Sequence, residues 1–218
     1  MGTDDVVTLD GRKLRTVRSR AAMSRAAFAL LTERGLEAVA VEDIAVRAGV
    51  TRRTFSRHFS SIEEAVLGDI DQDVHAFNAA LAERPPGEPP LIAYRNAVHD
   101  WLGAVFGEGR EAELAHRWEL FQHFEDEPAL LAAYQRIRVA AEGESRRILA
   151  DRLGVDPAAD LRPAAAVAAG AALIVAALQA WASGDDPGTL PALMTEFFDT
   201  LGSLAAQAVN ASILDEEA

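Results

Sequence analysis

Residues 41–59, VEDIAVRAGVTRRTFSRHF, decide the fold of the N-terminal part of this chain. They predict two short helices separated by a tight turn. Gly49 can adopt the left-handed backbone that ends a helix, and Thr51 can cap the next helix by accepting from its free N–H groups. In that second helix Phe55 and Phe59 are four residues apart and therefore share one face. We expect the two aromatic rings to hold the helix from behind.

The opposite face of the second helix is polar and basic. Arginine can pair with phosphates or guanine edges, and serine and threonine can donate to phosphates or bases. This is the layout of a helix-turn-helix, whose second helix enters the major groove of DNA. The residues predicted to contact DNA are Thr51, Arg52, Arg53, Thr54, Ser56, Arg57 and His58. Helix–glycine–helix corners also occur in all-α proteins purely as packing features, so this stretch alone leaves both interpretations open.

The charge of the chain is unevenly distributed. The formal net charge is −13, which is unusual for a protein that binds nucleic acid. Residues 11–60, however, hold eleven Lys and Arg against four Asp and Glu, a net of +7. Residues 61–218 hold ten against 27, a net of −17. A basic N-terminal region on an acidic remainder would concentrate attraction for phosphate at one end of the molecule.

A longer helix is predicted over residues 12–34, and Gly35 ends it. A basic cluster lies at and before its start. Contact with DNA phosphates and a merely solvated helix face are both compatible with this cluster. Its members are Arg12, Lys13, Arg15, Arg18 and Arg20.

The region around the two short helices resembles the N-terminal domain of the tetracycline-repressor (TetR) family of bacterial regulators. The resemblance rests on Gly35-Leu36-x-Ala38, Glu42-Asp43-Ile44-Ala45, Ala48-Gly49-Val50-Thr51, Thr54-Phe55, His58-Phe59 and Glu63-Glu64-Ala65. The sequence departs from the family pattern where a tyrosine, a lysine and a Ser or Thr cap are common, at Ser56, Ile62 and Ala40 respectively. The resemblance covers about residues 12–70. It implies a head that binds operator DNA, a divergent helical domain that binds a ligand, and dimerisation through the last two helices.

The remainder of the chain predicts helices separated by Gly-, Pro- and Asp-rich breaks, of which ERPPGEPP at 83–90 is the clearest. These helices span approximately residues 62–82, 91–107, 110–123, 127–153, 161–183 and 189–212. No alternating apolar pattern long enough for a sheet occurs. We therefore predict an all-α protein of about nine helices. Its parts are a disordered tail (1–11), a three-helix helix-turn-helix DNA-binding domain (12–60) and a helical ligand-binding and dimerisation domain (61–218).

Residues 164–182 carry no charge and are long enough to span a bilayer. Most of them are alanine, which is weakly hydrophobic, and we expect no membrane association. Small residues, Gly170 included, instead permit close approach of a neighbouring backbone. With the apolar stripe of the last helix they predict one half of a four-helix bundle between two copies of the chain, because a monomer would leave much of this surface in water. The stripe comprises Leu190, Leu193, Phe197, Leu201, Leu204 and Ala208.

Aromatic and polar residues in the middle of the chain are candidates for a ligand pocket. We single out His99, Trp101, Trp118, Phe121, His123 and Tyr134, each of which could instead be a core or surface residue. His116 and His123 could share a helix face, but two histidines alone are weak evidence for a metal, and we predict neither metal nor cofactor. No phosphate-binding loop, nucleophile motif or paired catalytic carboxylates stand out, so we do not expect an enzyme.

The sequence as a whole favours a homodimeric transcriptional regulator. The simplest version is a repressor that a small hydrophobic effector releases from palindromic double-stranded operator DNA, and an acyl-CoA-like molecule is one candidate effector. The absence of cysteine and of a signal peptide fits a cytoplasmic protein. The alternative from another class is an all-α small-molecule binding or carrier protein whose helix-turn-helix corner is only structural. Retention on heparin and salt-sensitive DNA binding would separate the two.

Overall fold

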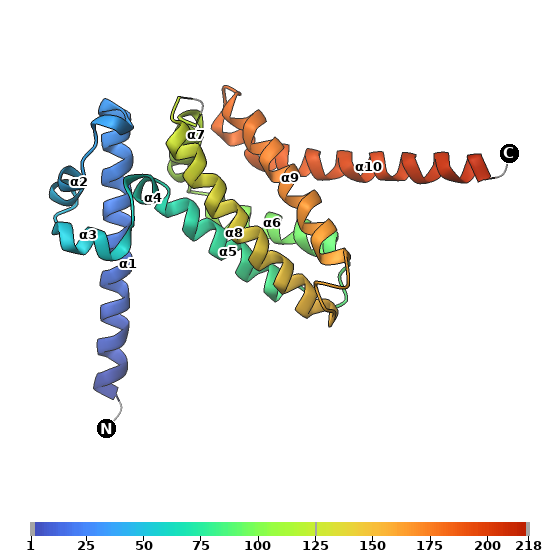
Figure 1. The fold of residues 1–218 in the computed structure, drawn as a ribbon, viewed down its shortest axis with the longest axis horizontal. Coiled ribbons are helices and arrows are strands. Elements are labelled where there is room, and N and C mark those ends of the chain that lie inside the picture. The colour runs from blue at the N-terminus through green and yellow to red at the C-terminus, as the bar shows by residue number, and fades with distance from the viewer. Residues whose placement is uncertain (1–2, 125, 217–218) are drawn as a thin grey trace. The chain divides into compact units, whose positions relative to one another are not determined.

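The computed structural model describes the backbone of residues 3–124 and 126–216, and the side chains of residues 15–124, 126–208 and 210. Within these residues the chain forms ten α-helices, two short 3-10 helices and no strand, which confirms the all-α prediction (Figure 1). The number exceeds nine because the helix predicted over 62–82 is two helices. They are α4 (Ile62–Val66) and α5 (Gly68–Glu83), and Leu67 separates them.

The elements before α4 are α1 (Thr3–Arg34), η1 (Leu36–Ala38), α2 (Val41–Arg47) and α3 (Arg52–His58). α1 begins earlier than expected, since helical backbone covers residues 3–11, which the sequence analysis assigns to a disordered tail. A glycine in a helix interior costs only about 1 kcal/mol relative to alanine, so Gly11 does not have to end the helix. Met1 and Gly2 lie outside the described residues.

The later elements are α6 (Pro90–Phe106), α7 (Glu111–Gln122), α8 (Pro128–Leu153), α9 (Arg162–Ala182), η2 (Pro187–Thr189) and α10 (Leu190–Glu216). Most of their ends lie within one or two residues of the predicted ones because strong breakers separate them. Pro90 starts α6, where its missing N–H costs nothing. Gly109 and Gly154 have φ of 82° and 64°, which favours glycine over other residues.

The chain divides into two compact units. Unit 1 comprises residues 1–72 and 124–137, and unit 2 comprises residues 73–123 and 138–218. Two helices, α5 and α8, contribute residues to both units. The predicted boundary after residue 60 divides the chain by function and not by compactness, and it stays a prediction.

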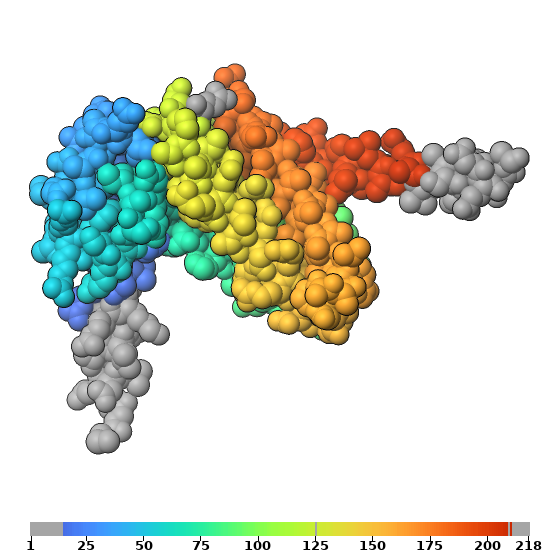
Figure 2. Space-filling model, in the orientation of Figure 1, coloured from blue at the N-terminus to red at the C-terminus, as the bar shows by residue number. Residues whose placement is uncertain are grey.

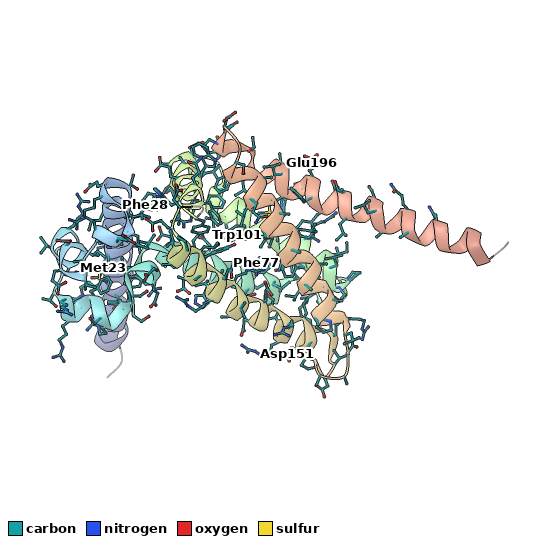
Figure 3. All side chains as sticks on the ribbon, turned by 45° about the horizontal axis from the view of Figure 1, so that its top comes forward. Met23, Phe28, Phe77, Trp101, Asp151 and Glu196 are labelled. Atoms are coloured by element: carbon teal, nitrogen blue, oxygen red, sulfur yellow. The ribbon has the colours of Figure 1, made fainter. Side chains whose placement is uncertain are left out.

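The core of unit 1 is apolar and comes from several helices. Met23 of α1, Ile44 of α2 and Phe55 of α3 are buried in it, together with Leu67 between α4 and α5 (Met23 is labelled in Figure 3). The segment 124–137 joins this unit, and its Glu127 carboxylate accepts a hydrogen bond of 3.0 Å from the Leu36 N–H. That bond satisfies a backbone donor at the start of η1.

Unit 2 is organised around α9, which packs against α6, α7 and α10. Trp181 of α9 is fully buried, and Leu190 and Met194 of α10 are also in the core. Gly170 of α9 faces the ring of Tyr94 in α6, and a Cβ added to it would lie 2.3 Å from the Tyr94 Cδ1. The expectation that Gly170 helps a second copy of the chain to approach is therefore wrong, because α6 of the same chain already occupies its surroundings.

Two features of α9 and α10 remain on the outside of unit 2. One face of α9 exposes the small residues Ala165, Ala168 and Ala172. The C-terminal part of α10 extends beyond α9, and Leu204 there is 56% exposed (Figures 1 and 2). Among the described residues, α9 alone is long and apolar enough to cross a membrane by length and composition, and 39% of its apolar window is buried in the protein.

Candidate nucleic-acid interface

The turn between α2 and α3 has the geometry that its sequence predicts. Gly49 has φ 67°, and the Val50 N–H donates to the Ala45 carbonyl at 2.9 Å. The Thr51 hydroxyl accepts from the Thr54 N–H at 3.1 Å and so caps α3. These contacts end one helix and start the next within four residues, which sets the direction in which α3 leaves the turn.

α2 begins without the usual Ser or Thr cap, as the departure at Ala40 suggests. The Asp43 carboxylate compensates in part, because it accepts from the Ala40 N–H at 3.3 Å. Asp43 is also paired with Arg34 at the end of α1. A carboxylate in the first turn further favours the positive end of the helix dipole.

The inner face of α3 is aromatic and buried. Phe55 is 2% exposed, Phe59 is also buried, and their ring centroids are 5.6 Å apart. Ile44 and Ala45 of α2 are buried in the same unit. This arrangement confirms the prediction that the two phenylalanines pack the inner face of α3 against the core.

The outer face of α3 is basic and accessible. Arg52, Arg53, Ser56 and Arg57 are exposed. Arg52 pairs with Glu42 of α2 at 2.8 Å, whereas Arg53 and Arg57 form no ion pair with any described side chain. Two exposed guanidinium groups without a carboxylate partner are free to pair with DNA.

The two threonines and the histidine of the predicted contact set are less available for contacts with DNA than the exposed arginines are. The Thr51 and Thr54 hydroxyls are 3.0 Å apart and share a hydrogen bond. His58 is half-buried, and its Nε2 is buried without a hydrogen-bond partner among the described residues. Burial lowers the pKa of His58, and the charges of Arg57 and Arg20 lower it further. The buried Nε2 cannot reach DNA in this arrangement.

The basic cluster of α1 does not act as a single group. Arg15 and Arg18 are exposed, while the side chains of Arg12 and Lys13 lie outside the described residues. Arg20 points into unit 1 and is 21% exposed. Its guanidinium donates to the His58 carbonyl at 2.9 Å and to the Asp71 carboxylate at 2.8 Å. Sequence reasoning missed this role because charge alone does not show which arginine of a cluster faces inward.

The predicted ligand residues belong to both compact units of the chain. Trp118 and Phe121 meet around Trp181: the Trp118 indole donates to the Trp181 carbonyl at 3.0 Å, and the Phe121 and Trp181 rings are 6.1 Å apart. Tyr134 lies in unit 1, where its ring is 5.0 Å from that of Phe124. Trp118, Phe121 and Tyr134 therefore each have a packing partner, and their part in ligand binding stays a prediction.

The other three ligand candidates lie elsewhere in unit 2. Trp101, labelled in Figure 3, stacks edge-on against Phe106 at 5.7 Å, and its indole nitrogen is buried without a partner among the described residues. His123 is half-buried at the end of α7. His99 is 85% exposed.

A hollow of about 550 Å³ lies between α6 and α10 in unit 2. Its apolar lining includes Leu102, Phe106, Met194 and Phe198, and of the predicted ligand residues His99 alone borders it. A hollow of this size is typical of small-molecule sites. Sequence reasoning missed the α10 lining because its residues follow no pattern that predicts a role: Pro191, Met194, Thr195, Phe198 and Asp199. Within the described residues, no group of three or more His, Cys, Asp and Glu could hold a metal ion.

Comparisons with known proteins agree with this geometry. Residues 24–67 match the family described as bacterial regulatory proteins, tetR family, and residues 88–206 match the MftR C-terminal domain. The chain is 40% identical over 194 residues to the HTH-type transcriptional regulator TcmR of Streptomyces glaucescens, which covers 88% of this chain and 84% of TcmR. A TetR-family regulator of Mesorhizobium loti has a similar fold, with a TM-score of 0.50, 17% identity, and coverage of 87% of this chain and 98% of that one.

Proposed function

Because the chain belongs to the TetR family of bacterial transcriptional regulators, we propose that it is a homodimeric repressor that a small hydrophobic effector releases from its operator. One observation carries the DNA-binding part. α3 is buried on its aromatic side and on the other exposes Arg53 and Arg57, which have no carboxylate partner among the residues that the structure describes. The proposed contact set is Thr51, Arg52, Arg53, Thr54, Ser56 and Arg57. A repressor that binds its operator would act in the cytoplasm.

Two copies of α3 would read two half-sites of a near-palindrome. Successive major grooves on one side of DNA are one helical turn apart, so a dimer with the correct spacing places one α3 in each. Arg53 and Arg57 would pair with phosphates or guanine edges, and Ser56 with phosphate or base. Arg52 would have to leave Glu42 to do the same, at little cost because both side chains are exposed.

Dimerisation through α9 and α10 is supported by what these helices leave uncovered. The alanines at 165, 168 and 172 follow one face of α9, and small side chains allow a second backbone to come close. Leu193, Phe197 and Leu201 of α10 are half-buried rather than buried, and Leu204 is exposed. A second copy would bury this apolar surface.

The proposed effector is a small, largely apolar molecule, and the hollow between α6 and α10 is one candidate for its site. Its phenylalanine, leucine and methionine lining suits an apolar body, while Arg95 and His99 at its border offer polar contacts. An acyl-CoA-like molecule, with an acyl chain and an anionic end, is one such ligand. Binding would release DNA by favouring a spacing of the two heads that no longer fits successive grooves.

The experiment that tests the DNA-binding function is selection of DNA from a random-sequence pool by the full-length protein. We expect a near-palindromic site, and affinity for it that falls with salt because counterions are released from the phosphates. The control is the double variant Arg53→Ala with Arg57→Ala, which should enrich no site. If the parent protein enriches no sequence, it is not an operator-binding protein. The result would then favour the alternative of a small-molecule binding or carrier protein.

The effector is tested on the selected duplex. Hydrophobic metabolites, acyl-CoAs included, are titrated into the fluorescent complex, and release of DNA is measured. Linkage requires the duplex to weaken effector binding by the same factor, typically about 5–150-fold. A compound that binds the protein equally well in the presence and in the absence of the duplex is not the effector.

A further inference from the structure

Arg20 makes three contacts inside unit 1. Its guanidinium donates to the His58 carbonyl at 2.9 Å and to the Asp71 carboxylate at 2.8 Å, and its Cζ lies 4.4 Å from the centre of the Phe59 ring. Both hydrogen-bond partners and the ring lie outside α1, the helix that carries Arg20. One side chain thus connects α1 to the end of α3 and to the start of α5.

The contact with His58 acts on the C-terminal end of the recognition helix. α3 has seven residues, so it is only two turns long, and His58 is its last residue. The last carbonyls of a helix have no partner within the helix, and a cation there is favoured by the helix dipole. The Thr51 cap and the turn fix the other end of α3. At the C-terminal end the Phe59 N–H donates to the Phe55 carbonyl at 3.0 Å, and Arg20 adds a contact from another helix at the His58 carbonyl.

The contact with Asp71 fixes Arg20 itself. Asp71 lies in the first turn of α5, and the packing there is close: a Cβ added to Gly68 would lie 2.1 Å from the Ser24 Oγ of α1 and 3.2 Å from the Phe59 ring. α1 and α5 thus meet without intervening side-chain volume at this point. A guanidinium held by a carboxylate on one such helix has little freedom to swing away.

We propose that Arg20 is a positioning residue for sequence-specific DNA recognition, which fixes the C-terminal end of α3 against α5 and does not bind phosphate. The inference rests on the proposed operator binding. It differs from the simplest interpretation of the basic cluster, in which every arginine of α1 neutralises a phosphate. A positioning residue and a phosphate ligand have different signatures in salt, because only the ligand releases counterions.

The test compares Arg20→Gln with Arg18→Gln, the same substitution at an exposed position of the same helix. Each variant is titrated at several salt concentrations with the duplex that the parent protein selects from a random pool, and with a scrambled duplex of equal length. For Arg20→Gln we expect the affinity for the selected duplex to fall about tenfold or more, as for a lost base contact, with the salt slope unchanged. Its affinity for the scrambled duplex should stay within about twofold, because phosphate contacts dominate non-specific binding.

Two further variants examine the connection to α5. Asp71→Asn should shift specificity in the same direction as Arg20→Gln, and the double variant should be no worse than Arg20→Gln alone, since Asp71 acts through Arg20. Arg20→Lys should recover part of the loss, because an ammonium can reach one of the two oxygens but lacks the planar fork.

Three results would overturn the inference. The first is a salt slope that falls by about 0.9 in Arg20→Gln, which would identify a phosphate contact. The second is an equal loss of affinity for both duplexes at unchanged slope, which would show that Arg20 is needed only for the head to fold. The third is unchanged affinity for the selected duplex. A parent protein that selects no duplex would instead remove the proposed function itself, and the inference with it.

Discussion

Arg53 and Phe55 lie two positions apart in α3 and have opposite surroundings. Arg53 is exposed and has no carboxylate partner among the described residues, whereas Phe55 is buried against Phe59. DNA recognition and folding stability therefore depend on different side chains of α3, because the side chains proposed to contact DNA contribute little to the core.

Alanine substitutions should show this separation. Arg53→Ala should lose about 1–3 kcal/mol of binding to the preferred site if Arg53 pairs with a base, and leave the unfolding free energy nearly unchanged. Phe55→Ala should lower the unfolding free energy by about 3–5 kcal/mol, because it leaves a cavity. DNA titration and urea unfolding of both variants measure the two effects. Parent-like binding of the selected site by Arg53→Ala would show that Arg53 does not face the groove.

The lowered pKa of His58 predicts a pH dependence of stability. Burial, Arg57 and Arg20 disfavour the protonated imidazole in the folded state, whereas the unfolded chain has the ordinary value of 6.5. Above pH 6.5 both states are neutral and stability is constant in this respect. As the pH falls below 6.5 the unfolded state binds the proton first, so stability is lost until the folded-state pKa is passed. Urea unfolding between pH 8 and pH 5 should show this decrease in the parent and a smaller one in His58→Gln. Equal decreases in both proteins would mean that other groups cause the pH dependence.

At the scale of elements, the approach of α9 to α6 depends on one glycine. Gly170→Ala would place a Cβ 2.3 Å from the Tyr94 ring, so the ring or the helix must move. We expect the unfolding free energy to fall by about 1–3 kcal/mol, as for other overpacked cores. The matched control is Gly202→Ala in α10, where an added Cβ meets no atom within 4 Å. That substitution should be neutral or stabilising by up to about 1 kcal/mol. Thermal unfolding that ranks the two variants in the reverse order would contradict this view of the α6–α9 contact.

Gly170 also shows where prediction from the sequence stops. Most of the helix limits from Pro90 onward were predictable, because Pro90, Gly109 and Gly154 act through local backbone conformation. The buried side of α3 was predictable too, since Phe55 and Phe59 are spaced for one face. Which neighbour a face meets depends on contacts distant in the sequence. The alanine-rich pattern therefore predicts that Gly170 faces a second copy, whereas Tyr94 of the same chain covers it.

The candidate sites show the same difference between features set by local sequence and features set by contacts distant in the sequence. The residues proposed to contact DNA follow from a short local motif, and the prediction that the arginines of α3 are exposed is confirmed. The inward direction of Arg20 depends on Asp71, 51 positions away, and no pattern in the sequence shows it. No motif marks the ligand candidates, which share only their aromatic or polar residue type. Trp118 and Phe121 proved to pack around Trp181, while the hollow is bounded by α10, which lies far from them in sequence.

At the scale of the whole molecule, the proposal requires two copies. Phe197→Glu places a charge on the half-buried stripe of α10 and should convert the dimer to monomer, because an unpaired charge at an apolar interface is costly. Operator affinity should fall with it, since two half-site contacts no longer act on one molecule. Sedimentation and DNA titration measure both. Val139→Glu, at an exposed apolar position of α8, is the control and should remain dimeric. A parent protein that is monomeric at micromolar concentration would contradict the assembly.

The one-sided burial of α3 has a consequence for how such a protein can change over generations. Substitutions at Arg53, Ser56 or Arg57 alter the outer face and leave Phe55 and Phe59 in place. A duplicated gene could therefore drift toward a new target sequence through intermediates that all fold. The same few codons would tolerate substitution without loss of the fold and would also change the DNA sequence that is bound, while the codons for the two aromatic residues stay under constraint.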